Sequence, residues 1–519
     1  MAQFDGTSEV NQSSSTGDGL QKLHTSLRSL SLKPDLQEDR QHRPRGRTAM
    51  IPPITCCVKS EDEIISHIKR ARNRNKIVRA EGSGHSYHKA IASDDDIVLR
   101  LRGELRSFEV ISGCGTLKTV TVKVGGGCYI GVNILDEEST EENSLIYQLN
   151  QLNCALPNLG GIAHQTIAGF MSTGSAGASI HQGWEEVIRE IHFINGLGEK
   201  QIAKKGSDLF NAVGVSLGLF GIITYIVLEV PSPSFLVSGQ QIKRDFKEYE
   251  IENKTVRDIL ESNEYAHLLW FPQKHAQFVV EWTAQKSTDG EIRPFTNSLS
   301  NKAMAQEVSA LLRVSHWLLE KEPRDETYEI IGLLLKLITR DTDQTFNDVW
   351  SSVLSSNDKV PVESIFQRQF TEMWFPIEKT QEVINILKLL FKDQKVAGNY
   401  GTEIYGAKKS EFWLSHSYDH NVVRVNPYWF VFQDGHPRQF FNNFWEVFLS
   451  VEGVRFHWAM FLPEPGKMYG GIKFDLKFLK KSYPKLVAWL EERERMDPDQ
   501  VFVTEYWRKI FEIKAKNKK

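Results

Sequence analysis

The pattern of apolar and polar residues changes near residue 231. Before that point, residues 119–124 alternate as a half-buried strand does, and residues 225–230 form an apolar run that reads as a buried strand. After it, residues 277–282 also read as a strand, and long segments have the 3.6-residue spacing of amphipathic helices. These predicted helices are residues 304–319, 328–338 and 380–391. The pattern predicts a chain of the α+β class.

Chain length predicts more than one folded region. The sequence has 519 residues, more than one hydrophobic core usually serves, and Pro231 and Pro233 mark a boundary between the two patterns. Residues 1–47 are rich in Ser, Gln, Asp and Lys with few aromatics, which predicts a disordered N-terminal tail. We therefore expect domains at 48–232 and 233–430, followed by a C-terminal segment at 431–519.

Charge and composition exclude several classes of protein. Lysine and arginine total 63 against 66 acidic residues, a net charge of -3, which argues against a nucleic-acid binder. The most apolar window, residues 215–230, is broken by glycine and Glu229, so no membrane span is expected. Five cysteines without regular spacing predict neither a disulfide framework nor a zinc site, and no metal is expected. This cysteine usage suggests a reducing compartment, and we expect a cytoplasmic protein.

A loop rich in glycine and hydroxyl groups follows the apolar pair at residues 77–78. Glycines at 82 and 84 remove the Cβ atoms that keep a phosphate away from backbone N–H groups, and Ser83 and Ser86 add hydroxyl donors. His85 lies inside this loop, where its imidazole could reach the ring of a bound cofactor. On its own the loop is compatible with a pyrophosphate cradle and with a plain turn.

Two further stretches favour the cradle over the turn. Residues 158–177 are dense in glycine and hydroxyls and offer little to a core, as expected where backbone lies against a large flat ligand and its diphosphate. Residues 217–224 form a third glycine-containing segment before the apolar strand. Three such loops in one region predict a dinucleotide site, although a pair of tight turns remains the simpler alternative.

The order of these stretches (GSGHS, NLGGI, QTIAG, STGSAG and LGLFGIIT) resembles the flavin-binding domain of the vanillyl-alcohol oxidase superfamily. Within it, the chain is most similar to the aldonolactone and alditol oxidases, the branch that includes gulonolactone and D-arabinono-1,4-lactone oxidases. The resemblance implies a two-subdomain PCMH-type FAD-binding domain at 48–232 and an α+β substrate cap at 233–430. It also implies that the segment at 431–519 completes the cap and the FAD site.

By the same resemblance the cofactor is FAD, attached covalently through His85 to the flavin 8-methyl carbon. His88 is the rival attachment site, and noncovalent binding remains possible. The residues that the resemblance assigns to cofactor binding are Gly82, Ser83, Gly84, His85, Ser86, Gly160, Gly161, Gln165, Thr166, Gly169, Ser172, Thr173, Gly174, Gly177, Gly221 and Ile222.

The implied catalytic residues are Glu403, Tyr405 and His457. Members of the branch carry a glutamate and an arginine two residues apart on a cap strand; here Glu403 matches and Tyr405 replaces the arginine. A second motif, HWxK, ends here in Met460, which cannot stabilise an anion. Other cations, such as Arg455 or Lys408, are candidates to substitute. Glu403 as a solvated carboxylate and His457 as a core histidine are the alternatives.

The resemblance implies an FAD-dependent oxidase that takes hydride from a hydroxyl-bearing carbon and passes electrons to dioxygen, giving hydrogen peroxide. Gly160 occupies a position at which glycine accompanies oxidase behaviour in the branch. The expected substrate is a small sugar lactone, alditol or other alcohol. The alternatives are a tailoring oxidase for a less polar secondary-metabolite alcohol, favoured by the loss of the arginine and lysine, and a flavin-binding redox protein with little turnover.

Overall fold

The computed structural model describes residues 54–93, 96–113, 118–251, 254–296, 302–321, 324–340, 342–355 and 367–516. The tail predicted at 1–47 lies outside these residues. Helices and strands alternate along the described chain, which confirms the α+β class. Within the described segments, no helix combines the length and the apolarity needed to cross a bilayer.

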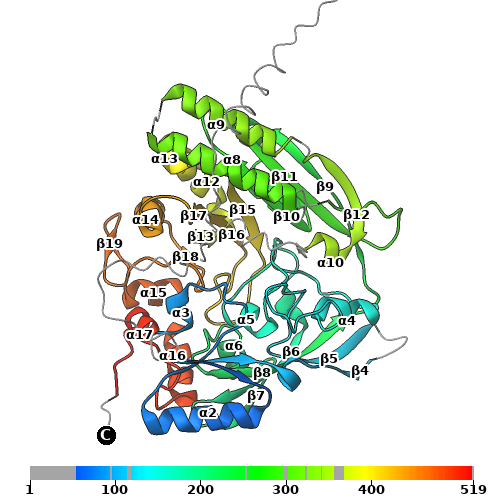
Figure 1. Ribbon diagram of the computed structural model, residues 1–519, viewed down its shortest axis with the longest axis vertical. Helices are drawn as coiled ribbons and strands as arrows, with labels where there is room; N and C mark the ends of the chain where they lie inside the picture. Colours follow the sequence, from blue (N-terminus) through cyan, green and yellow to red (C-terminus); the bar gives the residue numbers. More distant parts are fainter. Residues whose placement is uncertain are drawn as a thin grey trace, which may run out of the picture. The chain divides into compact units, whose positions relative to one another are not determined.

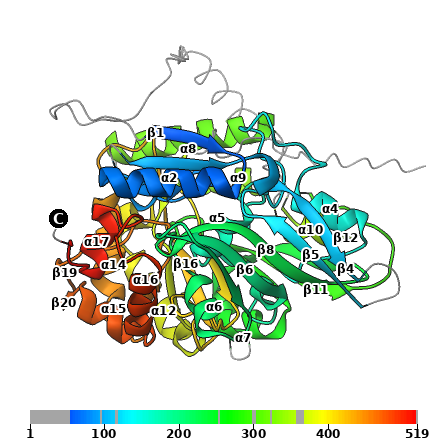
Figure 2. The ribbon, with the colours of Figure 1, turned by 90° about the horizontal axis from the view of Figure 1, so that it is seen from below.

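A small parallel sheet begins the described chain. Its order is β1-β3-β2, formed by Ile54–Val58, Ile97–Leu101 and Val78–Ala80. Helix α2 (Glu61–Arg74) starts after Ser60, whose hydroxyl accepts from the backbone N–H of Glu63. Its apolar face buries Ile64 and Ile68 in a core shared with this sheet and with Ile194 of the second sheet. Helix α2 (blue in Figure 2) packs against β2 and β6.

The second sheet is antiparallel, with five strands in the order β4-β5-β8-β6-β7. The strands span Phe108–Ser112, Thr119–Gly125, Gly221–Pro231, Ile188–Asn195 and Lys200–Lys204. The strand predicted at 119–124 is β5, and the one predicted at 225–230 belongs to β8. Strand β8 begins earlier than predicted because residues 221–223 already pair with β6. Short helices α4 (Leu145–Gln151), α5 (Ile167–Ser172) and α6 (Asp208–Val213) accompany this sheet.

The largest sheet has eight antiparallel strands in the order β12-β9-β11-β10-β15-β16-β14-β18. In that order they span Gln344–Val349, Leu236–Asp245, Phe278–Ser287, Tyr265–Phe271, Thr402–Ala407, Val422–Asn426, Met373–Pro376 and Arg455–Phe456. The strand predicted at 277–282 is β11. The last strand, β18, comes from the C-terminal part of the chain, so distant segments complete this sheet.

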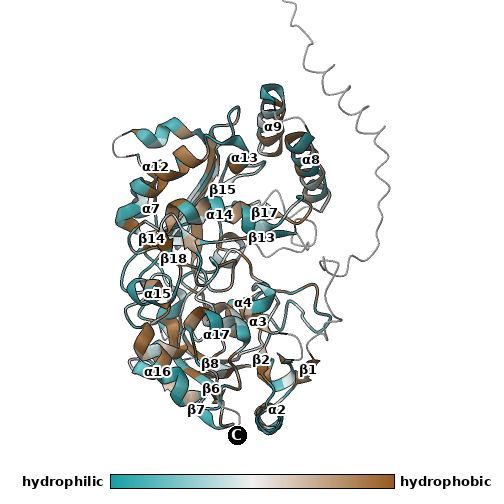
Figure 3. Ribbon diagram, turned by 90° about the vertical axis from the view of Figure 1, so that its left-hand side faces the viewer, coloured by the Kyte–Doolittle hydropathy of each residue, from teal (hydrophilic) through white to brown (hydrophobic). Residues whose placement is uncertain are grey.

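Helices cover both faces of the eight-stranded sheet (Figures 1 and 3). On one side, α8 (Lys302–Lys321) and α9 (Asp325–Ile338) lie side by side, and Ile331 and Leu335 of α9 pack against β10 and β11. On the other side, α7 (Val256–Ser262) and α12 (Thr380–Leu390) pack against each other and against β10 and β14. The three predicted helices are thus confirmed as α8, α9 and α12.

The C-terminal residues return to the first sheet. Helix α16 (Leu486–Met496) packs on α6, and α17 (Glu505–Phe511) packs on α3 (His88–Ile91). The backbone N–H of Val78 in β2 donates to the carbonyl of Val501 at 2.9 Å. The remaining elements are η1 (Gly103–Arg106), η2 (Trp184–Val187), η3 (Phe246–Glu250), α10 (Trp350–Val353), β13 (Arg368–Phe370), η5 (Ile377–Lys379), α13 (Gln394–Ala397), β17 (Tyr428–Phe430), α14 (Pro437–Phe448), β19 (Met468–Tyr469), β20 (Ile472–Lys473) and α15 (Leu476–Ser482).

Candidate active site

A cleft lies where the loops that follow β2 and β5 meet the segments that precede α5 and β8. It encloses about 1150 Å³ of empty space, part of it open to solvent, and residues 458–460 of the C-terminal segment close one side. Its lining includes residues 82–86, 165–175 and 217–221 in part, so all three glycine-containing stretches of the sequence contribute to this one cleft.

Most of the residues assigned to cofactor binding line this cleft. They are Gly82, Ser83, Gly84, His85, Ser86, Gln165, Thr166, Gly169, Ser172, Thr173 and Gly221. The other five do not line it. Gly174 and Gly177 line a small neighbouring cavity, Ile222 is buried in the core of the small sheet, and Gly161 is exposed. Gly160 packs on Phe170, whose ring would lie 2.5 Å from an added Cβ, so packing alone requires a glycine there.

The walls of the cleft approach each other so closely that side chains would not fit. A Cβ on Gly82 would lie 2.4 Å from Thr166 Oγ1. A Cβ on Gly126 would lie 2.4 Å from the carbonyl oxygen of Ile223, and one on Gly221 would lie 2.2 Å from that of Ile194. Bare backbone, hydroxyls and arginines around one cleft match the donor set that a flavin dinucleotide needs. The residues present therefore fit FAD.

Three arginines that the sequence analysis missed also line the cleft: Arg79, Arg102 and Arg106. Arg79 is buried, and its guanidinium donates to five backbone carbonyls: Ala90, Ile91, Leu217, Gly218 and Phe502. Burial lowers its pKa to about 10. Because these carbonyls belong to three distant segments, Arg79 joins helix α3 and the loop before β8 to the C-terminal segment.

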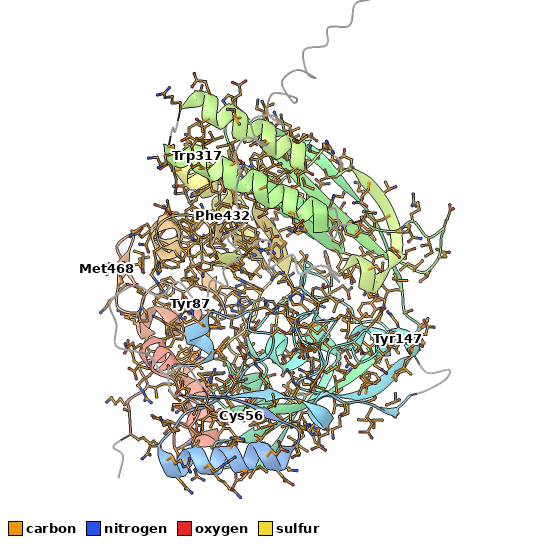
Figure 4. The ribbon with its side chains drawn as sticks, in the orientation of Figure 1. Cys56, Tyr87, Tyr147, Trp317, Phe432 and Met468 are labelled. Atoms are coloured by element: carbon orange, nitrogen blue, oxygen red, sulfur yellow. The ribbon has the colours of Figure 1, made fainter. Side chains whose placement is uncertain are left out.

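His85 is half-buried and lines the cleft. Its ring lies 4.7 Å from that of His164, and the Ser83 hydroxyl donates to the His164 carbonyl at 2.6 Å. The rival attachment site, His88, is exposed at the start of α3 and does not line the cleft. Tyr87 (Figure 4) lies between His85 and His88 in the sequence. Its backbone N–H donates to the Ala459 carbonyl at 2.6 Å, so a hydrogen bond connects the loop to the C-terminal segment.

Strand register assembles the second half of the site. Tyr405 of β15 pairs with His267 of β10 on one side and with Arg424 of β16 on the other, and Glu403 pairs with Asn426. Directly opposed residues of antiparallel strands project from the same face. The five side chains therefore share one face of the eight-stranded sheet, here called the polar face. Glu403 and Tyr405 are brought together there, as the sequence analysis expected.

Hydrogen bonds orient the predicted catalytic carboxylate. The Asn426 amide donates to Tyr405 Oη at 2.7 Å and to Glu403 Oε2 at 3.4 Å, and His267 Nε2 lies 3.8 Å from Glu403 Oε1. The Glu403 side chain is 24% exposed, so a ligand in front of the sheet can reach it. Burial lowers the pKa of His267 and raises that of Tyr405 well above its usual range. At neutral pH His267 is therefore uncharged and Tyr405 keeps its proton.

His457 lies at the junction of the polar face and the cleft. Its ring stacks on that of His416 with centroids 4.7 Å apart, and burial lowers its pKa to about 3, so it is neutral. The backbone N–H of Ala459 donates to His457 Nδ1 at 3.2 Å. The ring proton is therefore on Nε2, which lies 3.4 Å from the hydroxyl of Ser175, a residue of the cleft wall.

The two cations considered as substitutes are both engaged elsewhere. Arg455 donates to the carbonyls of His416, Tyr418 and Ser482, and Lys408 pairs with Glu186. The polar face has a different cation, Arg424, whose guanidinium pairs with the buried Glu372 at 3.2 Å. The sequence analysis missed Arg424, Asn426 and His267. The signal that could have found the first two is the i, i+2 spacing of polar residues within the apolar strand β16.

Comparisons with known proteins agree with this geometry. A family profile described as D-arabinono-1,4-lactone oxidase matches residues 231–510, and one described as an FAD binding domain matches residues 52–202. L-gulonolactone oxidase of Mus musculus is 24% identical over 461 residues, which is 87% of this chain and 93% of the mouse protein. D-arabinono-1,4-lactone oxidase of Candida albicans is 26% identical over 354 residues, 66% of this chain and 59% of the yeast protein.

Among solved structures, cholesterol oxidase from Brevibacterium sterolicum superposes with a TM-score of 0.65 at 14% identity, covering 88% of this chain and 94% of that one. At that identity the likeness shows the fold alone. The family profile, in contrast, matches more than half of the chain, and the resemblance found in the sequence is confirmed. The chain belongs to the D-arabinono-1,4-lactone oxidase family and is an FAD-dependent oxidoreductase that acts on a CH–OH group.

Proposed function

We propose that this protein oxidises the hydroxyl-bearing carbon of a small sugar lactone and passes the electrons to dioxygen. The observation that carries the proposal is the polar face, on which a carboxylate, an amide, a phenol, an imidazole and a guanidinium stand together, with the guanidinium hydrogen-bonded to carbonyls of the glycine-rich stretch at Ala176 and Gly177. Such a set of donors and acceptors suits a ligand with several oxygens. The relatives are named for lactones of this kind, L-gulonolactone and D-arabinono-1,4-lactone.

In this proposal each domain has its own role. Residues 48–232 bind FAD, residues 233–430 form the substrate cap, and residues 431–519 complete both. Support comes from the position of β18 at the edge of the eight-stranded sheet and from residues 458–460 at the side of the cleft. Bound FAD supplies a hydride acceptor for the carbon that bears the hydroxyl group.

Glu403 is the proposed proton acceptor for the substrate hydroxyl. Asn426 holds one carboxylate oxygen and neutral His267 lies beside the other, so the direction of the carboxylate is fixed. Tyr405 keeps its proton and serves as a hydrogen-bond donor to a substrate oxygen. Neutral His457 presents an N–H group toward the cleft through Ser175 rather than a positive charge.

The covalent bond to FAD is proposed at His85. Support comes from its position in the cleft wall, whereas His88 lies outside that wall. Purified protein should be yellow, and after acid precipitation the colour should remain in the pellet for the native chain and for His88→Ala. In His85→Ala the colour should move to the supernatant. Colour that stays in the pellet of His85→Ala would disprove this attachment site.

The substrate proposal is tested by mixing the yellow protein anaerobically with L-gulono-1,4-lactone, with D-arabinono-1,4-lactone and with a terpenoid alcohol. We expect either lactone to bleach the flavin absorbance and the terpenoid alcohol to leave it unchanged. Admitting air should restore the absorbance with formation of hydrogen peroxide. Bleaching by the terpenoid alcohol and by neither lactone would instead support the less polar substrate that the sequence left open.

A further inference from the structure

Arg424 has an unusual position for a buried cation. Its guanidinium carbon lies 3.7 Å from the centroid of the Tyr405 ring on one side and 4.7 Å from that of Trp374 on the other. Tyr405 and Trp374 are its direct partners on the neighbouring strands β15 and β14. Two aromatic rings therefore hold the cation in a fixed plane on the polar face.

The hydrogen bonds of Arg424 leave one of its three side-chain nitrogens without a partner in the described part of the chain. Nη1 lies 3.2 Å from Glu372 Oε1, and Nη2 donates to the carbonyls of Ala176 and Gly177 at 2.9 and 2.8 Å. Nε finds no partner among the described residues, although Arg424 is only 3% exposed. A buried donor without an acceptor is unfavourable, so this N–H points to an acceptor supplied by a ligand.

Asn426, two residues along the same strand, has an unused acceptor. Its Nδ2 donates to Tyr405 and Glu403, which fixes the orientation of the amide, because a carboxylate oxygen can only accept. Its Oδ1 finds no partner within the described chain, and the residue is 2% exposed. Side chains at i and i+2 of a strand project from the same face. A free donor and a free acceptor therefore stand side by side next to Glu403.

We propose that Arg424 and Asn426 form a substrate-binding subsite in which Arg424 Nε donates to one substrate oxygen and Asn426 Oδ1 accepts from a substrate hydroxyl. This inference rests on the proposed function and names the groups that select its substrate. A polyhydroxylated lactone has neighbouring oxygens that satisfy both atoms, whereas a less polar alcohol leaves one of them buried and unpaired. The positive charge of the site thus comes from β16, opposite the tyrosine on β15.

The experiment separates substrate binding from the chemical step. Anaerobic rapid mixing of flavin-loaded protein with increasing L-gulono-1,4-lactone or D-arabinono-1,4-lactone gives a dissociation constant and a limiting rate of flavin bleaching. For Arg424→Lys, which keeps the charge but lacks Nε–H, we expect the dissociation constant to rise about 10- to 100-fold. The limiting rate should change by less than about threefold, a split that a general loss of structure does not produce.

Three further variants complete the test. Asn426→Leu removes the Oδ1 acceptor at similar volume, together with the Nδ2 donor to Tyr405 and Glu403, and should weaken lactone binding by about tenfold or more. In the exchange Tyr405→Arg/Arg424→Tyr, which moves the cation to the opposed strand, affinity should be higher than in Arg424→Met. Flavin content measured from absorbance should match that of the native chain in Arg424→Lys and Asn426→Leu, because neither residue lines the flavin cleft.

The failure of this inference and that of the proposed function can be told apart. If the native protein is bleached by a lactone and both Arg424→Lys and Asn426→Leu bind that lactone with unchanged affinity, the subsite is wrong and the lactone oxidase proposal stands. If Arg424→Lys does not retain flavin, the affinity of Asn426→Leu alone decides. If neither lactone bleaches the native, flavin-loaded protein, the proposed function is wrong, and the subsite falls with it.

Discussion

The flavin cleft and the polar face are built in opposite ways. In the cleft, glycines let backbone segments approach so closely that a Cβ would lie 2.2 to 2.4 Å from a neighbouring oxygen. On the polar face, charged and aromatic side chains from adjacent strands hold one another through ion pairs and ring contacts. The first region needs side chains to be absent, and the second needs particular side chains to be present.

This difference determines how each region responds to substitution. A glycine replaced in the cleft changes backbone geometry, and so affects folding and cofactor binding together. A side chain replaced on the polar face changes a donor, an acceptor or a charge that lies outside the cofactor cleft. Cofactor content and catalytic rate should therefore be separable by mutation, and the following experiments test whether they are.

The largest effect is expected from Glu403→Gln. Glutamine keeps the shape of the side chain but is a poor proton acceptor, so the limiting rate of anaerobic flavin bleaching by lactone should fall about 10²- to 10⁴-fold. Flavin content should be unchanged, because Glu403 does not line the cleft. The matched control is Glu382→Gln on helix α12, where the exposed carboxylate is paired with Lys379 and a rate within about twofold of the native value is expected.

If Glu403→Gln lost its flavin, the distinction between the two regions would be wrong, because the polar face would then also hold the cofactor. A rate close to the native value in a protein that keeps its flavin would instead show that another group accepts the proton. Neutral His267, 3.8 Å from the carboxylate, would be the first residue to replace.

The next effect is expected from Gly126→Ala in the cleft. The new Cβ would lie 2.4 Å from the backbone carbonyl of Ile223, which cannot move without shifting β8. We expect the free energy of unfolding to fall by about 1–3 kcal/mol and the ratio of flavin to protein absorbance to fall with it. Urea unfolding and absorbance spectra measure the two quantities on one preparation.

Gly161→Ala is the control for this prediction. A Cβ at Gly161 meets no atom within 4 Å, so stability and flavin content should both remain close to those of the native chain. Loss of flavin in Gly161→Ala with unchanged stability would place that residue against the cofactor, as the sequence resemblance assigned it. Equal behaviour of the two alanine variants would contradict the close approach of the cleft walls.

The sequence predicted the cleft better than the polar face, and the reason is physical. A tight loop is encoded locally, so Gly82–Ser86 could be recognised from five consecutive residues. Even there, Gly161 and Ile222 were included although neither lines the cleft. Motif order identifies a loop, but the direction in which each residue faces depends on tertiary packing.

The polar face depends on strand register, which a single sequence does not reveal. Glu403 and Tyr405 were found because they are two residues apart. Arg424 is 21 positions from Glu403 and 19 from Tyr405, and it meets the tyrosine only because β15 pairs with β16. From the sequence alone, the absence of an arginine at position 405 was therefore interpreted as a loss of positive charge from the site. The charge is present, on the residue directly opposite.

The smallest effect is expected where the two regions adjoin, at Glu185. This residue lines a small cavity together with Gly174–Gly177 of the flavin loop and Lys408, which follows β15, and it accepts a hydrogen bond from Ser410 at 2.9 Å. Burial raises its pKa to about 7, with a smaller contribution from the negative charges of Glu186 and Glu411; the hydrogen bond from Ser410 and the charge of Lys205 act in the opposite direction. The folded protein therefore keeps a proton on Glu185 at pH values where the unfolded chain has released it.

Because the folded pKa is raised, the contribution of Glu185 to stability is complete below its unfolded pKa and is lost as pH rises through about 7. Glutamine mimics the protonated carboxyl at every pH and can still accept from Ser410. The free energy of unfolding of Glu185→Gln relative to the native chain should therefore increase between pH 5.5 and 8 by on the order of 1 kcal/mol, a value reduced by partial exposure.

Denaturant titrations of both proteins at each pH measure this difference. Taking the difference cancels the similar pH dependence of Glu372 and Asp497, whose pKa values are also raised. A difference that stays constant over this range would mean that Glu185 is ionised in the folded protein and that the small cavity beside it is open to water.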